Sequence, residues 1–223
     1  MFSHTEAVLF DLDGTLVNSA PDLAIAVNAT MVELGRQEYP LEQIIQWVGN
    51  GSKILLKRAL TGEFDGQPDE QLLMDTIPIF FKHYGDNLSN ATVVYDGVIP
   101  TLRALQEANI KMACVTNKPI EFANPVLDAF GLSHFFPIVL GGNSLPVLKP
   151  SPEPLLFACE QFAVKPSNAL MVGDSSSDVK AAKAANMNCI ALDYGYSQGV
   201  DLLSLGANKM ISNFEELPTL IGL

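Results

Sequence analysis

The stretch Ala7-Val8-Leu9-Phe10-Asp11-Leu12-Asp13-Gly14-Thr15, residues 7–15, decides the fold of this 223-residue chain. Its apolar beginning at residues 7–11 predicts a strand that is covered on both faces, as in a parallel sheet. Asp11 and Asp13 are separated by one residue, so their carboxylates point to the same side of an extended chain. Gly14 lets the backbone turn directly after them. Taken alone, an Asp-x-Asp-Gly sequence is equally typical of a solvated turn.

Four further runs of branched and aromatic residues predict the rest of the sheet, at residues 110–116, 136–140, 169–173 and 189–192. Segments with helical start and stop signals lie at residues 100–109, 121–130 and 178–186. Strands and helices alternate from about residue 95 onward, and this order predicts right-handed crossovers between parallel strands. The expected fold class is therefore α/β with a parallel sheet at its core.

Residues 18–94 interrupt this alternation with helical segments at 21–34, 41–47, 52–60 and 69–84. A helical block between the first strand and the rest of a sheet indicates an inserted cap. We therefore expect a core formed by residues 1–17 and 95–223, and a helical insert formed by residues 18–94. Pro78 is expected to kink or split the last helix of the insert, because proline removes a backbone donor.

The composition excludes several classes of protein. Lys and Arg total 13 and Asp and Glu total 25, which gives a net charge of −12. Nucleic-acid binders and peripheral membrane proteins normally present a basic face, so neither partner is expected. No apolar stretch approaches the roughly 20 residues that span a bilayer, and the beginning of the chain lacks the basic region of a signal peptide. Three widely spaced cysteines suit reduced thiols, so we expect a cytoplasmic protein.

Three further motifs follow predicted strands. Thr116-Asn117-Lys118-Pro119 follows the second strand, Lys149 lies in a proline-rich loop before a helix, and Asp174 and Asp178 follow the fourth strand. Each has an ordinary structural explanation when it is taken alone: a helix cap, a solvated charge, or acids that complement a helix dipole. In an open α/β sheet, however, ligands bind at the carboxyl ends of the strands, where these motifs lie together.

The four acids Asp11, Asp13, Asp174 and Asp178 would place about four negative charges at this edge. Desolvated charge at that density requires a divalent cation, and carboxylates without nearby His or Cys favour Mg²⁺. Together with Lys149 and the hydroxyl of Thr116, these acids provide what phosphoryl transfer requires: a nucleophile, an acid and base, a metal and oxyanion donors.

This ordered set of motifs resembles the haloacid dehalogenase superfamily, and the helical insert resembles that of members with a small helical cap. The resemblance covers nearly the whole chain and implies a Rossmann-like parallel sheet core. It implies that Asp11 is the nucleophile and that Asp13 protonates the leaving group and then activates water. It also implies that Asp11, the backbone carbonyl of Asp13 and Asp174 hold Mg²⁺.

The resemblance assigns supporting roles to further residues. Asp178 would support the metal ligands and orient Lys149, while Thr116 and the amide of Asn117 would bind the phosphoryl oxygens. Asn18 departs from the family pattern, because many relatives carry an aspartate there; its position at the expected hinge puts only local contacts in question. The expected activity is Mg²⁺-dependent hydrolysis of a small phosphate ester through an aspartyl phosphate.

Residues of the insert resemble the superfamily members that hydrolyse 2-phosphoglycolate, which is therefore the expected substrate. Gly49, Asn50 and Gly51 would form an amide-rich turn over a small anion. Arg58 would offer its guanidinium to a carboxylate, although a salt bridge on the helix surface explains it equally simply. A monomer or a homodimer is expected.

Several alternatives stay open at this point. Sugar-phosphate phosphatases and mutases and pyrophosphatases share all four motifs, so the catalytic residues do not separate them from the expected activity. Phosphonate-cleaving relatives would need an insert lysine such as Lys53 or Lys57, and they lack an aspartate at the position of Asp13. A phosphate-binding regulatory module without turnover would have no use for the insert.

Overall fold

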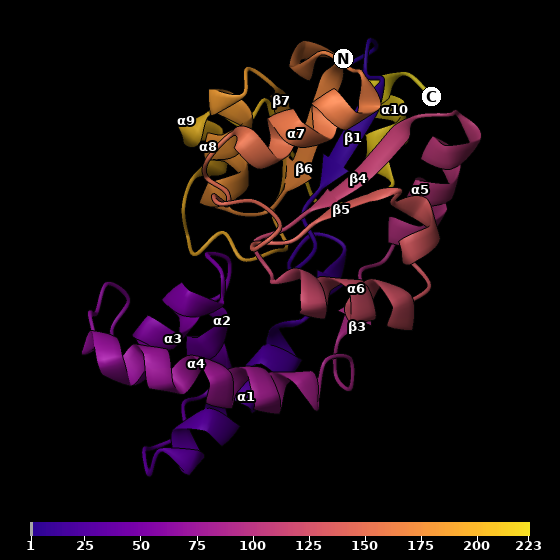
Figure 1. Cartoon of the computed structure of the whole chain (residues 1–223). Coiled ribbons are helices and arrows are strands. Elements are labelled where there is room, and N and C mark those ends of the chain that lie inside the picture. Colours follow the sequence, from indigo (N-terminus) through magenta and orange to yellow (C-terminus); the bar gives the residue numbers. More distant parts are fainter. Residues whose placement is uncertain (1) are drawn as a thin grey trace.

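The computed structural model describes residues 2–223, and within this range six parallel strands form the central sheet (Figure 1). The strand order is β5-β4-β1-β6-β7-β8, so β1 lies in the middle, with β4 and β6 on either side. The strands are β1 (Ala7–Phe10), β4 (Lys111–Val115), β5 (Ile138–Leu140), β6 (Ala169–Gly173), β7 (Asn188–Leu192) and β8 (Lys209–Ile211).

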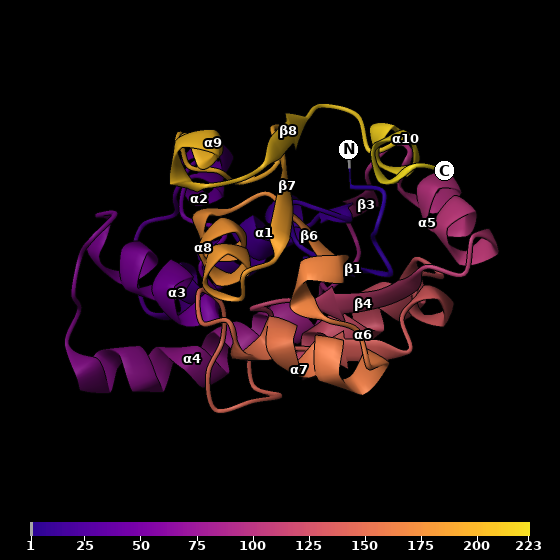
Figure 2. The same ribbon diagram turned by 90° about the horizontal axis from the view of Figure 1, so that it is seen from above.

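Side chains alternate along each strand, so every strand points apolar side chains to both faces of the sheet. Helices cover both of these faces. Val8 and Phe10 of β1 pack into one apolar cluster, and Ala7 and Leu9 pack into the other. Figure 2 shows α5 and α10 on the side of the sheet opposite to α7. The first face is covered by α5 (Val98–Glu107), α6 (Ile120–Ala129) and α10 (Glu216–Ile221), and the second by α7 (Glu153–Phe162), α8 (Ser176–Ala184) and α9 (Leu202–Leu205).

The helical insert lies below the sheet in Figure 1, apart from the helices that cover the sheet. It leaves and rejoins the core through β2 (Val17–Asn18) and β3 (Val93–Val94), which pair as a short antiparallel ribbon. Its apolar side chains form a third cluster, which Phe122 and Tyr196 of the core join. The insert contains α1 (Ala20–Glu33), α2 (Leu41–Ile45), α3 (Ser52–Thr61) and α4 (Glu70–Gly85).

A buried carboxylate ties the two connections of the insert together. Asp22, in the first turn of α1, is fully buried. It accepts hydrogen bonds from the Ala91 amide at 2.9 Å and from the amide and hydroxyl of Thr92 at 2.7 and 2.6 Å. Hydrogen bonds to a charged acceptor are stronger than neutral ones, so Asp22 fixes the beginning of α1 against the segment that leads into β3.

The predicted fold class is confirmed; the five predicted strands are observed with ends that differ by a few residues, and β8 was not predicted. The expected break at Pro78 is not observed: α4 runs unbroken from Glu70 to Gly85. Asp69 caps this helix by accepting a hydrogen bond from the Leu72 amide at 3.0 Å. The Phe80 and Tyr84 side chains, on the apolar face of the helix, are buried. These interactions outweigh the roughly 3 kcal/mol that an internal proline costs a helix.

Candidate active site

The carboxyl ends of the three central strands bring the predicted acids together. Asp11 directly follows β1, and its amide donates to the Val172 carbonyl of β6 at 3.0 Å. Thr116 directly follows β4 and Asp174 directly follows β6. All three side chains are buried. The parallel register therefore places these residues at one point of the sheet edge, as the strand-end rule predicts.

Glycine is required at two turns, where the backbone passes close to Asp174. Gly14 has a φ of +87°, and a Cβ atom there would lie 2.2 Å from Asp174 Oδ2. A Cβ on Gly195 would lie 2.3 Å from Asp174 Cβ. The Asp174 carboxylate accepts from the Thr15 hydroxyl at 2.7 Å and from the Tyr196 amide at 2.6 Å. Asp174 is therefore enclosed by backbone that only glycine allows to come this close.

The carboxylates of Asp11, Asp174 and Asp178 offer oxygens that lie within 4.8 Å of one another. Burial raises the pKa of the Asp11 carboxyl to about 7, against the lowering effect of Lys149 and with the support of the Asp178 charge. Burial and the charges of Asp11 and Asp178 also raise the pKa of Asp174 well above its usual range. These buried carboxylates cannot all ionise unless a cation offsets their mutual repulsion. Because they offer only oxygen ligands, they fit a hard divalent cation.

Lys149 is held in place by the acids around it. Its Nζ donates to Asp178 Oδ1 at 2.6 Å and to the Val115 carbonyl at 2.6 Å, and lies 3.1 Å from Asp11 Oδ1. The other Asp178 oxygen accepts from the Ser175 hydroxyl at 2.7 Å. Burial alone would lower the pKa of Lys149, but the Asp11 and Asp178 charges raise it above its ordinary value. The lysine therefore stays a cation beside the expected nucleophile.

Lys118 is a site residue whose role was not predicted from the sequence. Its buried Nζ lies 2.8 Å from Asp13 Oδ1 and 3.1 Å from Asp13 Oδ2, and it also donates to the Tyr84 hydroxyl of α4. The Ser19 hydroxyl donates to Asp13 Oδ1 at 2.5 Å. One available signal was a lysine directly after a buried strand in a chain with 13 basic residues.

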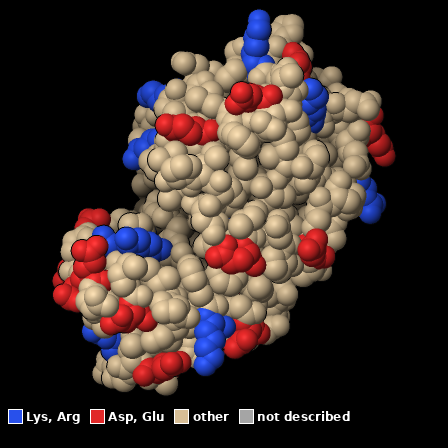
Figure 3. Space-filling view, viewed as in Figure 1, with Lys and Arg blue, Asp and Glu red and all other residues tan. Residues whose placement is uncertain are grey.

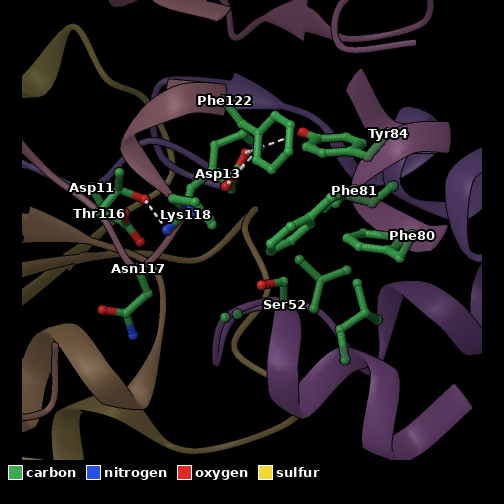
Figure 4. A pocket seen from close by; sticks show the side chains of 16 residues that line it. Asp11, Asp13, Ser52, Phe80, Phe81, Tyr84, Thr116, Asn117, Lys118 and Phe122 are labelled. Carbon is green, nitrogen blue, oxygen red and sulfur yellow. Dashed lines mark hydrogen bonds and ion pairs between the residues drawn. The ribbon is translucent and has the colours of Figure 1, made fainter. Parts of the chain in front are cut away.

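A cavity of about 50 Å³ lies between this cluster and the helical insert, beside the contact of Lys118 with Tyr84. Figure 4 shows Phe80, Phe81 and Tyr84 of α4 on one side, and Asp11, Lys118 and Thr116 on the other. The insert side is mostly apolar, and the core side carries the charges. The lining residues from the insert include Leu23, Val48, Gly49, Gly51, Ser52, Leu55, Phe80, Phe81 and Tyr84.

The comparison with known proteins agrees with this geometry. A family model described as haloacid dehalogenase-like hydrolase matches residues 8–192. The chain belongs to the haloacid dehalogenase-like hydrolases. The resemblance inferred from the four motifs is thereby confirmed.

Curated relatives of this hydrolase are similar to it over nearly the whole chain. A phosphoglycolate phosphatase of Nitrosospira multiformis is 44% identical over 216 residues, which cover 97% of this chain and 95% of the relative. A phosphoglycolate phosphatase of Pseudomonas syringae pv. tomato is 47% identical over 211 residues, which cover 94% and 77%. The crystal structure of a predicted phosphoglycolate phosphatase from Haemophilus somnus has a TM-score of 0.90 and 34% identity, covering 97% of this chain and 98% of that one.

Arg58, which was predicted to bind substrate, makes its hydrogen bonds inside the insert. Arg58 is buried within the insert, where it donates to the Trp47 carbonyl at 2.7 Å and to the Phe64 carbonyl at 2.9 Å. Its guanidinium also lies 3.7 Å from the centre of the Phe64 ring. Arg58 thus joins two loops of the insert; it lines a wider cleft between insert and core and is not among the residues that line the cavity beside Asp11. Asn117 lines the cavity, while its side chain points away in Figure 4 and donates to the Lys149 carbonyl at 2.8 Å.

The predicted glycine turn does reach the site. Gly49 and Gly51 line the cavity, and Asn50 donates to the Ser177 hydroxyl of α8 at 3.3 Å. Gln198 of the core donates to Asn50 Oδ1 at 3.2 Å and also to the Val48 carbonyl. These contacts hold the turn against the core, so the insert is closed over the acids.

A wider cleft of about 760 Å³ lies between insert and core outside this turn, and Lys53, Lys57 and Lys149 are among its lining residues. On the face shown in Figure 3, acidic side chains spread over both insert and core, and basic ones lie between them without forming a patch. Within residues 2–223, every helix is too short or too polar to cross a membrane.

Proposed function

We propose that this hydrolase is a Mg²⁺-dependent phosphatase that converts 2-phosphoglycolate to glycolate and phosphate. The observation that carries the proposal is the small cavity that Asp11 and Asp13 share with the insert. Its volume of about 50 Å³ and its largely apolar wall on the insert side suit a small leaving group. The names of the curated relatives support the same substrate.

In the proposed reaction, Asp11 attacks phosphorus and forms an aspartyl phosphate, while Asp13 donates a proton to the leaving glycolate oxygen. Asp13 then takes a proton from the water that hydrolyses the intermediate. The geometry supports these roles because Asp11 Oδ1 already accepts from the Leu12 amide at 2.7 Å and lies near Lys149, which leaves Oδ2 for the attack. Dividing hydrolysis into two displacements needs one group that acts first as acid and then as base.

The remaining core residues would position the phosphoryl group. The buried Thr116 hydroxyl and the Asn117 amide, at the end of β4, would donate to its oxygens. Asp11, Asp174 and the backbone carbonyl of Asp13 would hold Mg²⁺, with Asp178 orienting Lys149 beside them. When bound, Mg²⁺ would neutralise charge that builds up on the phosphoryl oxygens.

The role of the insert, the cellular location and the oligomeric state are also proposed. We propose that residues 18–94 act as a cap, supported by the contacts of Asn50 with Ser177 and Gln198 across the site. Three buried free cysteines support a cytoplasmic location, where thiols stay reduced. A monomer or a homodimer is proposed, and light scattering at assay concentration measures which it is.

Steady-state kcat/KM values for a panel of phosphates test the proposed function. The panel holds 2-phosphoglycolate, hexose phosphates and pyrophosphate, each measured with Mg²⁺ and with a chelator. We expect 2-phosphoglycolate to rank first and the chelator to abolish turnover. A higher rank for a hexose phosphate or pyrophosphate would reject the substrate, and turnover by a folded Asp11→Asn variant near the wild-type rate would reject the covalent mechanism.

A further inference from the structure

Lys118 is the one basic side chain among the described residues that line the cavity beside Asp11. It is 5% exposed and lies between the core and α4. Its Nζ contacts Asp13 at 2.8 and 3.1 Å, donates to the Tyr84 hydroxyl, and lies 4.7 Å from the centre of the Tyr84 ring. A cation buried at the boundary between insert and core is not needed to bind the phosphoryl group, since Lys149 lies beside Asp11.

The proposed substrate brings a second anion into this cavity. A phosphoryl group next to Asp11 would leave the carboxylate of 2-phosphoglycolate further along the cavity, towards the insert. The wall there is formed largely by apolar side chains such as Leu55, Phe80 and Phe81. An unpaired carboxylate is costly in such surroundings, so the cavity must supply a cation. Arg58 does not supply it, because its guanidinium bonds to carbonyls inside the insert.

We propose that Lys118 Nζ and the Tyr84 hydroxyl form a binding site for the carboxylate of the leaving group, an inference that rests on the proposed function. One CH₂ group separates the ester oxygen of 2-phosphoglycolate from its carboxylate. The residue that protonates the ester oxygen and the residue that binds the carboxylate must therefore be neighbours. Asp13 and Lys118 meet this requirement, with 2.8 Å between carboxylate oxygen and ammonium nitrogen.

The contacts of Lys118 leave room for a ligand. Both oxygens of Asp13 lie near Nζ, so one of these contacts can be exchanged for a substrate oxygen while the other still holds the ammonium. Tyr84 is fixed by stacking on Phe80, with ring centres 5.7 Å apart, and by edge contact with Phe122 at 5.3 Å. Its hydroxyl therefore keeps its place and can donate to the carboxylate. Because Tyr84 belongs to the insert, this site forms only when the insert is closed.

The test compares 2-phosphoglycolate with ethyl phosphate, in which a methyl group replaces the carboxylate. We measure kcat/KM for both substrates with the Mg²⁺-loaded wild type, Lys118→Met, Tyr84→Phe and Lys165→Met. Lys165 is exposed and far from the cavity lining, so its variant controls for the loss of one positive charge. For Lys118→Met we expect the preference for 2-phosphoglycolate to fall about 10- to 100-fold, the range of a hydrogen bond to a charged group. For Tyr84→Phe we expect a fall of about 3- to 10-fold.

Each outcome separates the inference from the proposed function. If both variants lose activity equally on the two substrates, Lys118 acts only by positioning Asp13, and the carboxylate site is refuted while the proposed function stands. If the wild type shows no preference for 2-phosphoglycolate, the proposed substrate is wrong and the carboxylate site is refuted with it. Circular dichroism checks folding; if Lys118→Met does not fold, Tyr84→Phe decides, because it keeps the stacked ring and removes only the hydroxyl.

Discussion

Replacing Asp11 by asparagine is expected to stabilise the metal-free hydrolase at neutral pH while abolishing turnover. In the unfolded chain Asp11 ionises near its ordinary pKa of 3.8, but burial raises its pKa in the folded protein to about 7. The folded state therefore binds the proton more tightly, and stability is lost as the pH rises through this range. Asparagine has a similar shape and no charge to desolvate. Lys149 keeps a partner in the variant, because Asp178 Oδ1 lies 2.6 Å from its Nζ.

The size of the effect follows from the pKa. A shift from 3.8 to about 7 corresponds to roughly 4 kcal/mol, since each pKa unit is worth about 1.4 kcal/mol. The stability gap between variant and wild type should widen by about 1.4 kcal/mol per pH unit between pH 3.8 and 7 and stay constant above pH 7. For a chain of this length, 1 kcal/mol moves the Tm by about 2–4 °C.

Urea unfolding of both proteins from pH 5 to pH 8 in a chelator measures this gap. Other titrating groups contribute to both curves and cancel in the difference. With Mg²⁺ added, the wild type should gain more stability than the variant, most strongly at pH 8. Parallel curves for the two proteins in the chelator would refute the reasoning, because they would mean that Asp11 ionises alike in the folded and unfolded states.

Three further predictions concern the surroundings of the site. Arg58→Met should lower the free energy of unfolding by about 2–4 kcal/mol in urea titrations, because two buried carbonyls lose a charged donor, while kcat/KM stays within about threefold. Gly14→Ala should weaken Mg²⁺ binding in calorimetry and reduce activity more than 100-fold, because the added Cβ would displace Asp174. Gly199 also has a positive φ, of +74°, but has open space around it, so Gly199→Ala is the matched control and should stay active. Gln198→Ala should raise KM several-fold and change kcat little, because Asn50 and the Val48 carbonyl each lose a hydrogen bond to the core.

The sheet and the acid cluster could be predicted because their signals are local. Each acid follows a continuous apolar run, and the rule that parallel strands end at one edge brings distant runs together. The strand β8 and the helix α9 escaped prediction because they are short: β8 has three residues and α9 has four. Such segments have too few residues to show a hydrophobic periodicity. β8 is a strand because it pairs with β7.

The roles of Lys118 and Arg58 could not be predicted, because they depend on how the insert packs. Lys118 contacts Tyr84, which lies 34 residues away in the sequence, and the sequence around neither residue predicts this contact. Arg58 was assigned to the substrate from its charge, but its partners are backbone carbonyls, which have no sequence signature. Side-chain roles at a boundary between two units are set by tertiary packing, and sequence periodicity does not contain that information.

The charges of the site explain how a protein with a net charge of −12 would bind an anionic ester. Within the described residues, Lys118 pairs with Asp13, and Lys149 pairs with Asp11 and Asp178, while Asp174 has no basic partner. Four carboxylates thus face two ammonium groups, and the difference equals the charge of one divalent cation. Without that cation the site would repel a phosphate ester as the rest of the surface does. On the proposed function, removal of Mg²⁺ should therefore weaken substrate binding as well as turnover, because the ion supplies the positive charge that the two lysines do not.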